Sequence, residues 1–524
     1  MTDSLANENT QSAKRGVKSG NQTPSSSRVS FPIVILGVPF DNVTTREAIG
    51  QIEQMIASGL PHYVATANVD FLVQAQRDTE LRRILSDAHL VLCDGTPLLW
   101  ASRVLGNALP ERVAGADLVP LLIEVAANRG YRLFFLGASP ESADQAVANL
   151  RKLYPKLIIA GHYSPPFKPL FQMDHEDIKS RILNASPDIL FVGFGCPKQE
   201  KWMSMHYRSL QVPVMVGVGA TIDFLAGRVK RAPLWMQRSG VEWVFRLAQE
   251  PRRLLGRYLT DLWVFGWKIL AQGWQMRTRR SGNVPEQERA AVQAEAQWQT
   301  LQLPEILDLH MVQNYDDLVS QAVSAGSHCF LEMSQVTFVD STGLGLLVRL
   351  QKKLREINRR LVLVSPGPAV RHVLRLVHLE ELFCIAQNLE AAKQIVAPNS
   401  GPGGNSHVWT TADHDLRWQG EITAANADEV WRKTRVHLDH PWTSASFRID
   451  LSEVTFIDSS GLGMMLRARK WAQRQNRPLI FSGVPSVVRN VLRIARLEKL
   501  LLNDDAQGAN GSEKGLVASS TAAW

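Results

Sequence analysis

Polar and glycine-rich residues follow four predicted strands in the first half of the chain. These patches are TANVD at 66–70, CDG at 93–95, GFGCPKQE at 193–200 and GVGATID at 217–223, the last continuing into AGRVKRAP at 226–233. Glycines at strand ends let a backbone approach a ligand closely, and helix N-termini favour phosphate groups. The four patches therefore indicate a site for a phosphate-bearing ligand.

Each patch also has an ordinary structural interpretation. Asp94 could cap the helix that Thr96 and Pro97 open, with Thr96 in the N-cap position. Lys198, Gln199 and Glu200 could form a solvated first helical turn. Cys196 is more consistent with a small packing residue than with a nucleophile, since no histidine that could activate it lies near it in the sequence. The spacing alone leaves these alternatives open.

The elements that would position these patches alternate between strand and helix. Apolar runs predict strands at 62–65, 90–93, 131–136, 157–160, 189–192 and 214–218. Amphipathic stretches between them predict helices at 69–88, 96–105, 116–128, 143–153 and 177–184. This alternation predicts an α/β domain with a mostly parallel sheet, helices on both faces and a ligand crevice at the carboxyl ends of the strands.

Composition narrows the class of protein. The chain has 524 residues, 45% of them hydrophobic and 21% charged, which excludes wholesale disorder and a polytopic membrane protein. Four cysteines without CxxC spacing are too few for a disulfide framework and indicate a reducing, cytoplasmic compartment. Residues 1–30 are serine-rich and polar, so we expect a disordered tail without the apolar core of a signal peptide.

The positive charge is concentrated in one segment, 224–280. It carries 12 Lys and Arg against 3 acidic residues, and 5 of the 14 tryptophans. Basic residues interleaved with Trp predict contact with an anionic bilayer surface, although a solvated helix pair is the alternative. The segment is not a membrane span, because Asp261 and Lys268 bracket an apolar run far shorter than the roughly 20 residues a span needs.

The second half of the chain contains a repeat. VTFVDSTGLG at 336–345 recurs as VTFIDSSGLG at 454–463, and the offset continues without a gap to Leu379 and Leu497. We therefore expect two copies of one small domain. The predicted division is a tail at 1–30, a first domain at 31–275, linkers at 276–303 and 398–406, repeats at 304–397 and 407–503, and a flexible tail at 504–524. The first linker is expected to keep the repeats separate from the first domain.

Three long motifs of the first domain resemble one family. DAHLVLCDGTPLLWASRVLGNALPERVAGADL (87–118), GFGCPKQEKW (193–202) and FLAGRVKRAPLWMQRSGVEWVFRLAQEPRRL (224–254) are similar to the signatures of the WecB/TagA/CpsF glycosyltransferases (glycosyltransferase family 26 type). The resemblance implies inverting, metal-independent transfer, with no cofactor, of an N-acetylmannosamine-type sugar from a UDP-sugar. The implied acceptor is a sugar linked through diphosphate to a lipid (undecaprenyl diphosphate), in extracellular polysaccharide biosynthesis at the inner face of the cell membrane.

The resemblance also implies roles for single residues. Asp94 matches the proposed catalytic base. The implied substrate-binding positions are Thr66, Asn68, Arg112, Gln199, Arg246 and Arg253. The last two are arginines that fold over the site and meet the diphosphate. At Gly256, where relatives can carry a further arginine, the adjacent Arg257 is the substitute.

The repeats are similar to STAS domains, the small α/β fold of anti-sigma-factor antagonists. That resemblance implies that the first hydroxyl of DSxG accepts phosphate, here Ser341 and Ser459, although N-capping is the structural alternative. A phosphoacceptor must be exposed at its helix start. A kinase or an anti-sigma-like protein is the implied partner of this tandem, which we expect to regulate or scaffold the enzyme.

One alternative function stays open at this stage: a non-catalytic signalling protein that senses a nucleotide sugar or a lipid and acts through its STAS domains. No recognised nucleic-acid module is present, and no histidine cluster has zinc-ligand spacing. We expect a peripheral protein on the cytoplasmic side of the membrane, and self-association is compatible with the sequence.

Overall fold

The computed structural model describes residues 31–229, 232–233, 236, 242–249, 265–272, 292–295, 298–308, 316–357, 359–396, 408–410, 416–439, 447–475, 477–495 and 497–502. The expected tails at 1–30 and 504–524 and the linker at 398–406 lie outside these residues.

The N-terminal domain alternates strands and helices, as predicted. Its strands are β1 Ile33–Ile35, β2 Val38–Phe40, β3 His62–Ala67, β4 Leu90–Cys93, β5 Arg132–Gly137, β6 Ile158–Tyr163, β7 Ile189–Gly193 and β8 Val214–Gly217. Its helices are α2 Thr45–Ser58, α3 Val69–Ala75, α4 Thr79–Asp87, α5 Thr96–Val104, α6 Gly115–Arg129, α7 Pro140–Leu153, α8 His175–Ala185, α9 Lys198–Leu210, α10 Thr221–Leu225 and α12 Glu242–Gln249. A further helix covers 265–272.

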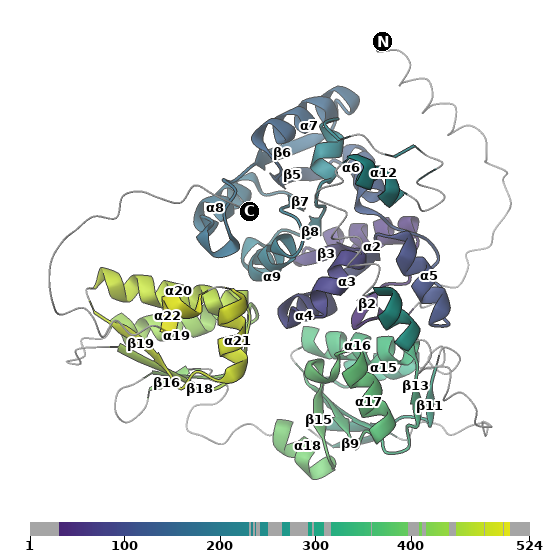
Figure 1. Ribbon diagram of the computed structural model, residues 1–524, viewed down its shortest axis with the longest axis vertical. Helices are drawn as coiled ribbons and strands as arrows, with labels where there is room; N and C mark the ends of the chain where they lie inside the picture. The colour runs from purple at the N-terminus through teal and green to yellow at the C-terminus, as the bar shows by residue number, and fades with distance from the viewer. Residues whose placement is uncertain are drawn as a thin grey trace.

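Six parallel strands form the main sheet in the order β4-β3-β8-β7-β5-β6 (Figure 1). Successive residues of one strand belong to different apolar cores, as Phe134 and Phe135 of β5 show. Both faces of the sheet are therefore buried, which confirms the expected parallel sheet with helices on both sides. The short ribbon of β1 and β2 is separate and antiparallel.

The predicted helix at 69–88 is two helices, α3 and α4. Asp78 has extended backbone and its side chain accepts a hydrogen bond from the Leu81 amide, so it caps α4. The predicted N-cap of α5 is also shifted by one residue, since Gly95 is the N-cap and Thr96 is the first helical residue. Both differences come from local capping at loop positions, where hydrophobic periodicity carries no information.

The first repeat consists of β9 Val292–Glu295, β10 Trp298–Gln302, β11 Ile306–Leu307, α15 Asp316–Ser324, β12 His328–Glu332, β13 Phe338–Val339, α16 Ser341–Glu356, β14 Leu361–Val364, α17 Pro368–Leu376, β15 Cys384–Ala386 and α18 Leu389–Val396. Its main sheet has the order β15-β14-β12-β10-β9. The linker predicted at 276–303 is therefore wrong for its last part, because β9 and β10 pair inside this sheet.

The second repeat consists of β16 Val408–Thr410, β17 Leu416–Ile422, α19 Ala427–Asp439, β18 Phe447–Ile457, α20 Ser459–Arg474, β19 Leu479–Ser482, α21 Ser486–Ile494 and α22 Glu498–Leu502. Its sheet has the order β16-β17-β18-β19, with β16 antiparallel to β17 and the other pairs parallel. The first repeat has the same pattern, with β9 antiparallel to β10 and the later pairs parallel. The two sequence copies are thus two copies of one fold.

The first repeat shares its hydrophobic core with the N-terminal domain. Ile33 and Ile35 of β1 belong to the same buried cluster as Leu344 and Leu347 of α16. The backbones approach so closely that a β-carbon on Gly345 would clash with the carbonyl oxygen of Pro32. The expectation that a linker keeps the first repeat separate is therefore wrong.

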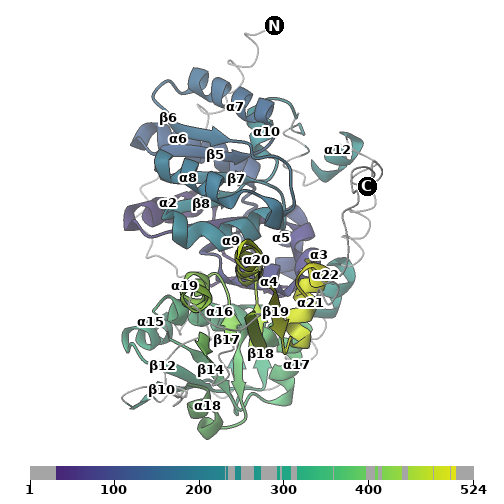
Figure 2. The ribbon, with the colours of Figure 1, turned by 90° about the vertical axis from the view of Figure 1, so that its left-hand side faces the viewer.

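The second repeat has a core of its own, against which Phe171 of the N-terminal domain packs, and polar side chains also cross this interface. Arg83 of α4 pairs with Glu421 at 3.2 Å and lies over the ring of Phe456. Arg467 of α20 pairs with Glu176 of α8 at 3.4 Å. Figures 1 and 2 show α4 at the place where the N-terminal domain and both repeats meet.

Candidate functional site

The predicted site residues gather at the carboxyl ends of neighbouring strands. Thr66 is near the end of β3, and its hydroxyl donates a 2.9 Å hydrogen bond to the carbonyl of Gly217 at the end of β8. Asn68 follows β3 and caps α3, with its side-chain oxygen accepting from the amides of Asp70 and Phe71. Thr66 is therefore held by the backbone at the end of β8, and Asn68 by the first turn of α3.

Asp94 lies directly after β4, beside these residues. Its amide donates to the carbonyl of Ala67 at 2.9 Å, which ties the end of β4 to the end of β3. Its carboxylate accepts a 3.4 Å hydrogen bond from the amide of Gly115, the first residue of α6. A helix N-terminus favours the ionised carboxylate, the form able to accept a proton.

Gln199 joins two strand-end loops. Its side-chain oxygen accepts hydrogen bonds from the amides of Gly195, after β7, and Gly219, after β8, both at 3.1 Å. Its side-chain nitrogen donates to Glu200 Oε1 at 2.7 Å. Gln199 is 2% exposed, so this side chain shapes the loops around the site, and the solvated helical turn considered above is wrong for it and for the buried Glu200.

Glu200 is a buried acid whose environment the sequence did not reveal. Burial raises the pKa of its carboxyl group to about 7, and the negative charge of Asp70 adds to this effect. Its Oε2 atom has no hydrogen-bond partner in the described part of the chain. The only signal in the sequence is its position within GCPKQE, because burial of a helical acid depends on contacts with distant strands.

Arg112 connects the strand ends to the C-terminal part of the domain. Its guanidinium donates to Asp117 at 2.7 Å and to Glu242 of α12 at 2.8 Å. Burial alone would lower its pKa, but the hydrogen bond to Glu242 and the charges of Asp117 and Asp94 raise the pKa overall. Arg112 therefore stays cationic beside Asp94.

The two arginines expected to cover the site are placed only in part. Arg246 belongs to α12, the helix that Glu242 fixes to Arg112, but its side chain lies outside the described residues. Arg253 lies outside them entirely. Their predicted contact with the diphosphate remains a prediction.

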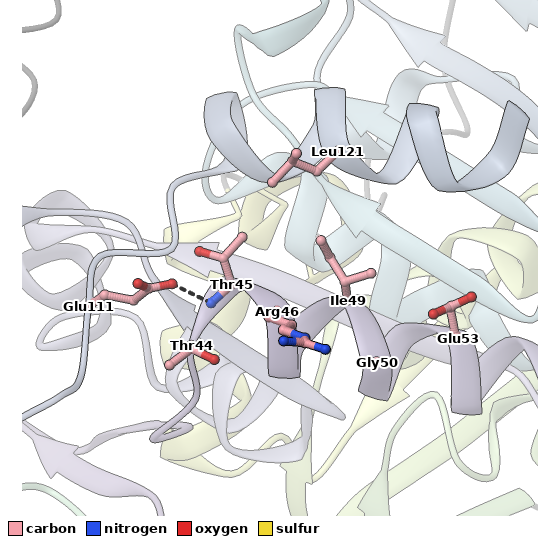
Figure 3. A pocket seen from close by; sticks show the side chains of 8 residues that line it. All are labelled: Thr44, Thr45, Arg46, Ile49, Gly50, Glu53, Glu111 and Leu121. Atoms are coloured by element: carbon pink, nitrogen blue, oxygen red, sulfur yellow. Dashed lines mark hydrogen bonds between the residues drawn. The ribbon is translucent and has the colours of Figure 1, made fainter. Parts of the chain in front are cut away.

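A separate hollow lies elsewhere on the N-terminal domain (Figure 3). It has a volume of about 530 Å³ and lies between α2 and α6, where the amide of Thr45 donates to Glu111 at 2.5 Å. None of the strand-end residues lines it. It therefore does not belong to the candidate site.

The predicted phosphoacceptors Ser341 and Ser459 begin α16 and α20, as expected for DSxG. Both serines are buried, however, with exposed fractions of 0% and 2%. The Ser341 hydroxyl donates to the carbonyl of Leu105, and the Ser459 amide donates to Glu80. In this arrangement the expected exposure of both serines is therefore wrong, because the N-terminal domain covers the two helix starts.

Part of the basic, Trp-rich segment is described as the helix at 265–272. Phe265, Ile269 and Gln272 are buried on one face, and the Gln272 side chain bonds to the backbone of Val34 and Leu36 in the β1–β2 ribbon. Trp267 and Leu270 on the other face are 70% and 64% exposed. Among the described helices, none is long and apolar enough to cross a membrane.

Comparison with known proteins finds a matching family for the N-terminal domain and for each repeat. The model of the glycosyl transferase WecG/TagA/CpsF family matches residues 33–279, and STAS models match 291–392 and 407–503. Two proteins of Staphylococcus aureus, from strains MW2 and NCTC 8325, are N-acetylglucosaminyldiphosphoundecaprenol N-acetyl-beta-D-mannosaminyltransferases. Each is 31% identical over 237 residues, which are 45% of this chain and 91% of the relative.

Among solved structures, a putative anti-sigma factor antagonist of Thermotoga maritima is 24% identical, with a TM-score of 0.18, and covers 20% of this chain and 93% of its own. The family model and the two staphylococcal relatives coincide with the domain that carries Asp94 and the other strand-end residues. The chain belongs to the WecG/TagA/CpsF glycosyltransferase family, with two STAS domains after the transferase domain.

Proposed function

We propose that this protein transfers an N-acetylmannosamine-type sugar from a UDP-sugar to a lipid-diphosphate-linked N-acetylglucosamine acceptor, with inversion at the anomeric carbon. The observation that carries the proposal is the position of Asp94 beside Thr66, Asn68 and Arg112 at the strand ends. The staphylococcal relatives are named for this donor sugar and this type of acceptor.

Asp94 is the proposed general base. A direct displacement with inversion needs one base to take the proton of the acceptor hydroxyl as its oxygen attacks the sugar. The amide of Gly115, the first residue of α6, donates to this carboxylate and holds it beside the strand ends. No covalent bond between sugar and enzyme is needed.

The departing UDP carries the negative charge that develops in this step. We propose that arginines neutralise it, with Arg246 and Arg253 reaching it from the segment that Glu242 and Arg112 fix to the strand ends. Preorganised cations are an effective way to stabilise such charge. The proposed reaction then needs no metal ion, and turnover should persist in EDTA.

The acceptor is lipid-linked, so we propose a peripheral location on the inner face of the membrane. Trp267 and Leu270 supply an exposed apolar face within the basic segment, and Trp100 on the helix after Asp94 is 53% exposed. Tryptophan prefers the headgroup level of a bilayer, and each nearby Lys or Arg adds roughly 1 kcal/mol on anionic lipid. Trp267→Ser with Leu270→Ser should lower co-sedimentation with anionic vesicles, and unchanged binding would contradict this location.

The STAS domains are proposed to regulate the enzyme through a protein partner, such as a kinase acting on Ser341 or Ser459. Their tandem arrangement behind the transferase supports this role, and among the described contacts of the strand-end residues none is with either repeat. Phosphosite mapping of protein purified from its native cell tests the proposal, and absence of phosphate at both serines would contradict phosphorylation.

The decisive experiment is release of UDP from UDP-N-acetylmannosamine with a soluble lipid-diphosphate-N-acetylglucosamine acceptor. Asp94→Asn keeps size and hydrogen bonding but removes the base, so kcat should fall by about 10²–10⁴-fold while donor binding persists. Asp144→Asn, at an exposed position of α7, is the matched control on the same domain. Full activity of Asp94→Asn would refute the assignment, and absence of any transfer by the wild type would favour a sensor of nucleotide sugars.

A further inference from the structure

The start of α20 is occupied by a carboxylate from another domain. Asp458 caps this helix, accepting hydrogen bonds from the amides of Ser460 at 2.8 Å and Gly461 at 3.0 Å. The remaining amide of the first turn, that of Ser459, donates to Glu80 of α4. Glu80 thus provides the acceptor for the Ser459 amide, although the two residues are 379 positions apart in the sequence.

Residues of the N-terminal domain position Glu80 for this contact. Its second oxygen is 2.8 Å from Lys201 Nζ, and Lys201 is also 2.7 Å from Asp78, the cap of α4. Glu80 is 6% exposed and Ser459 is 2% exposed, so water is excluded from the contact. One lysine therefore pairs with both Asp78 and Glu80.

At the corresponding helix start in the first repeat, the described contacts with the N-terminal domain involve no carboxylate. Ser341 donates to the carbonyl of Leu105 at 3.4 Å, and the side chain of Asn107 donates to Thr342 at 2.9 Å. Both contacts are between neutral groups. The two repeats therefore present the same DSxG helix start to the N-terminal domain in chemically different ways.

We propose that the N-terminal domain is itself a binding partner of the second repeat, docked through Glu80 at the start of α20, and that a negative charge added at position 459 expels Glu80 and releases the repeat. The helix start is a position that favours one anion. A further anion on Ser459 would face Glu80 and Asp458 in a space closed to water, where like charges repel strongly.

The surrounding contacts fit a reversible interface. They include the pair of Arg467 with Glu176, in which both side chains are largely exposed, and Gly463, whose nearest neighbour across the interface is the flexible end of Met205. The second repeat keeps its own buried core when these contacts break. Release therefore does not require unfolding.

The test compares Ser459→Asp with Ser459→Asn in the full chain. The two side chains have the same shape, and Asp suits the first turn of an isolated helix, so only the docked state should distinguish them. We expect Ser459→Asp to shift the docking equilibrium toward release by about tenfold or more relative to Ser459→Asn. The readouts are the radius of gyration by X-ray scattering and amide exchange of α8 and α20.

Two controls make the result specific. Ser341→Asp and Ser341→Asn change the first repeat, where no Glu80 is present, and should leave the exchange of α8 unchanged. Combining Ser459→Asp with Glu80→Gln, which keeps the acceptor but removes its charge, should restore docking in part. Equal behaviour of Ser459→Asp and Ser459→Asn, with the second repeat folded by circular dichroism, would overturn the proposal. These readouts do not depend on glycosyl transfer.

Discussion

The two repeats share a sequence motif and one fold, but they are attached to the N-terminal domain by different physical means. The first contributes α16 to a hydrophobic core that continues into β1 of the N-terminal domain. The second keeps a separate core and meets the N-terminal domain through Arg83, Glu80 and Arg467. Continuous apolar packing predicts one cooperative unit, whereas two separate buried cores predict a module able to separate.

The largest expected difference comes from Leu344 and Leu462, which are equivalent buried positions in the two repeats. Leu344→Ala and Leu462→Ala should each cost about 2–5 kcal/mol of unfolding free energy, because both side chains are buried. Leu344→Ala should lower the melting temperature of the N-terminal domain as well, whereas Leu462→Ala should lower only that of the second repeat. Scanning calorimetry checks this, and a separate transition for the first repeat would contradict the shared core.

A glycine pair gives the next largest effect. A β-carbon on Gly345 would clash with the carbonyl of Pro32, whereas one on Gly463 would meet only Met205 at 3.9 Å. Gly345→Ala should therefore destabilise the protein by about 1–3 kcal/mol. Gly463→Ala should stabilise its helix by about 0.5–1 kcal/mol. Urea unfolding of the two variants measures both, and equal effects would show that the first interface is looser than described.

Docking of the second repeat should depend on pH. Burial raises the pKa of Asp458 from its ordinary 3.8 to about 7, with Glu80 adding to the rise and the amides of Gly461, Ala424 and Ser460 opposing it. The other charged groups facing this pair are Asp78 and Lys201. A carboxyl group with a raised pKa holds a proton in the docked state that the released state has lost.

Docking should therefore weaken as the pH rises from about 4 to about 7 and change little above that, by at most about tenfold per pH unit for one proton. Scattering measured across this window should show a growing radius of gyration. Asp458→Asn, which still caps α20, should remove the dependence. If docking of the wild type did not change with pH, the docked state would hold no additional proton at Asp458.

The smallest effect is expected at the edge of the second interface. Arg467→Gln or Glu176→Gln removes an exposed ion pair, typically worth about 0.2–1 kcal/mol. Added salt should mask the difference between these variants and the wild type, because exposed charges are screened. Amide exchange of α8 at low and high salt measures it, and a large loss of docking would mean that this pair is central to the interface.

The strands and the strand-end site could be predicted because their signals are local. Six apolar runs became the six strands of the main sheet, and Asp94, Thr66, Asn68 and Gln199 follow or end those strands. What Gln199 does there could not be predicted, since its hydrogen bonds join Gly195 and Gly219, two loops that only the folded sheet brings together.

The strands hidden in the predicted linker were missed for a different reason. In β10 the buried positions are Gln299 and Leu301, and the glutamine satisfies its side chain by donating to the carbonyl of Ala322. A buried glutamine breaks the apolar alternation by which a half-buried strand is identified. The covered serines were missed because their neighbours, Leu105 and Glu80, belong to another domain.

The burial of the β1–β2 ribbon determines which parts of the chain can be removed without exposing it. All six ribbon residues are fully buried, with the first repeat and the helix at 265–272 packed against them. Removing the first repeat would expose part of this ribbon to water, so the N-terminal domain alone should be less stable than the fused protein. Deleting only the second repeat removes a self-contained unit, which leaves that copy free to be lost, exchanged or duplicated.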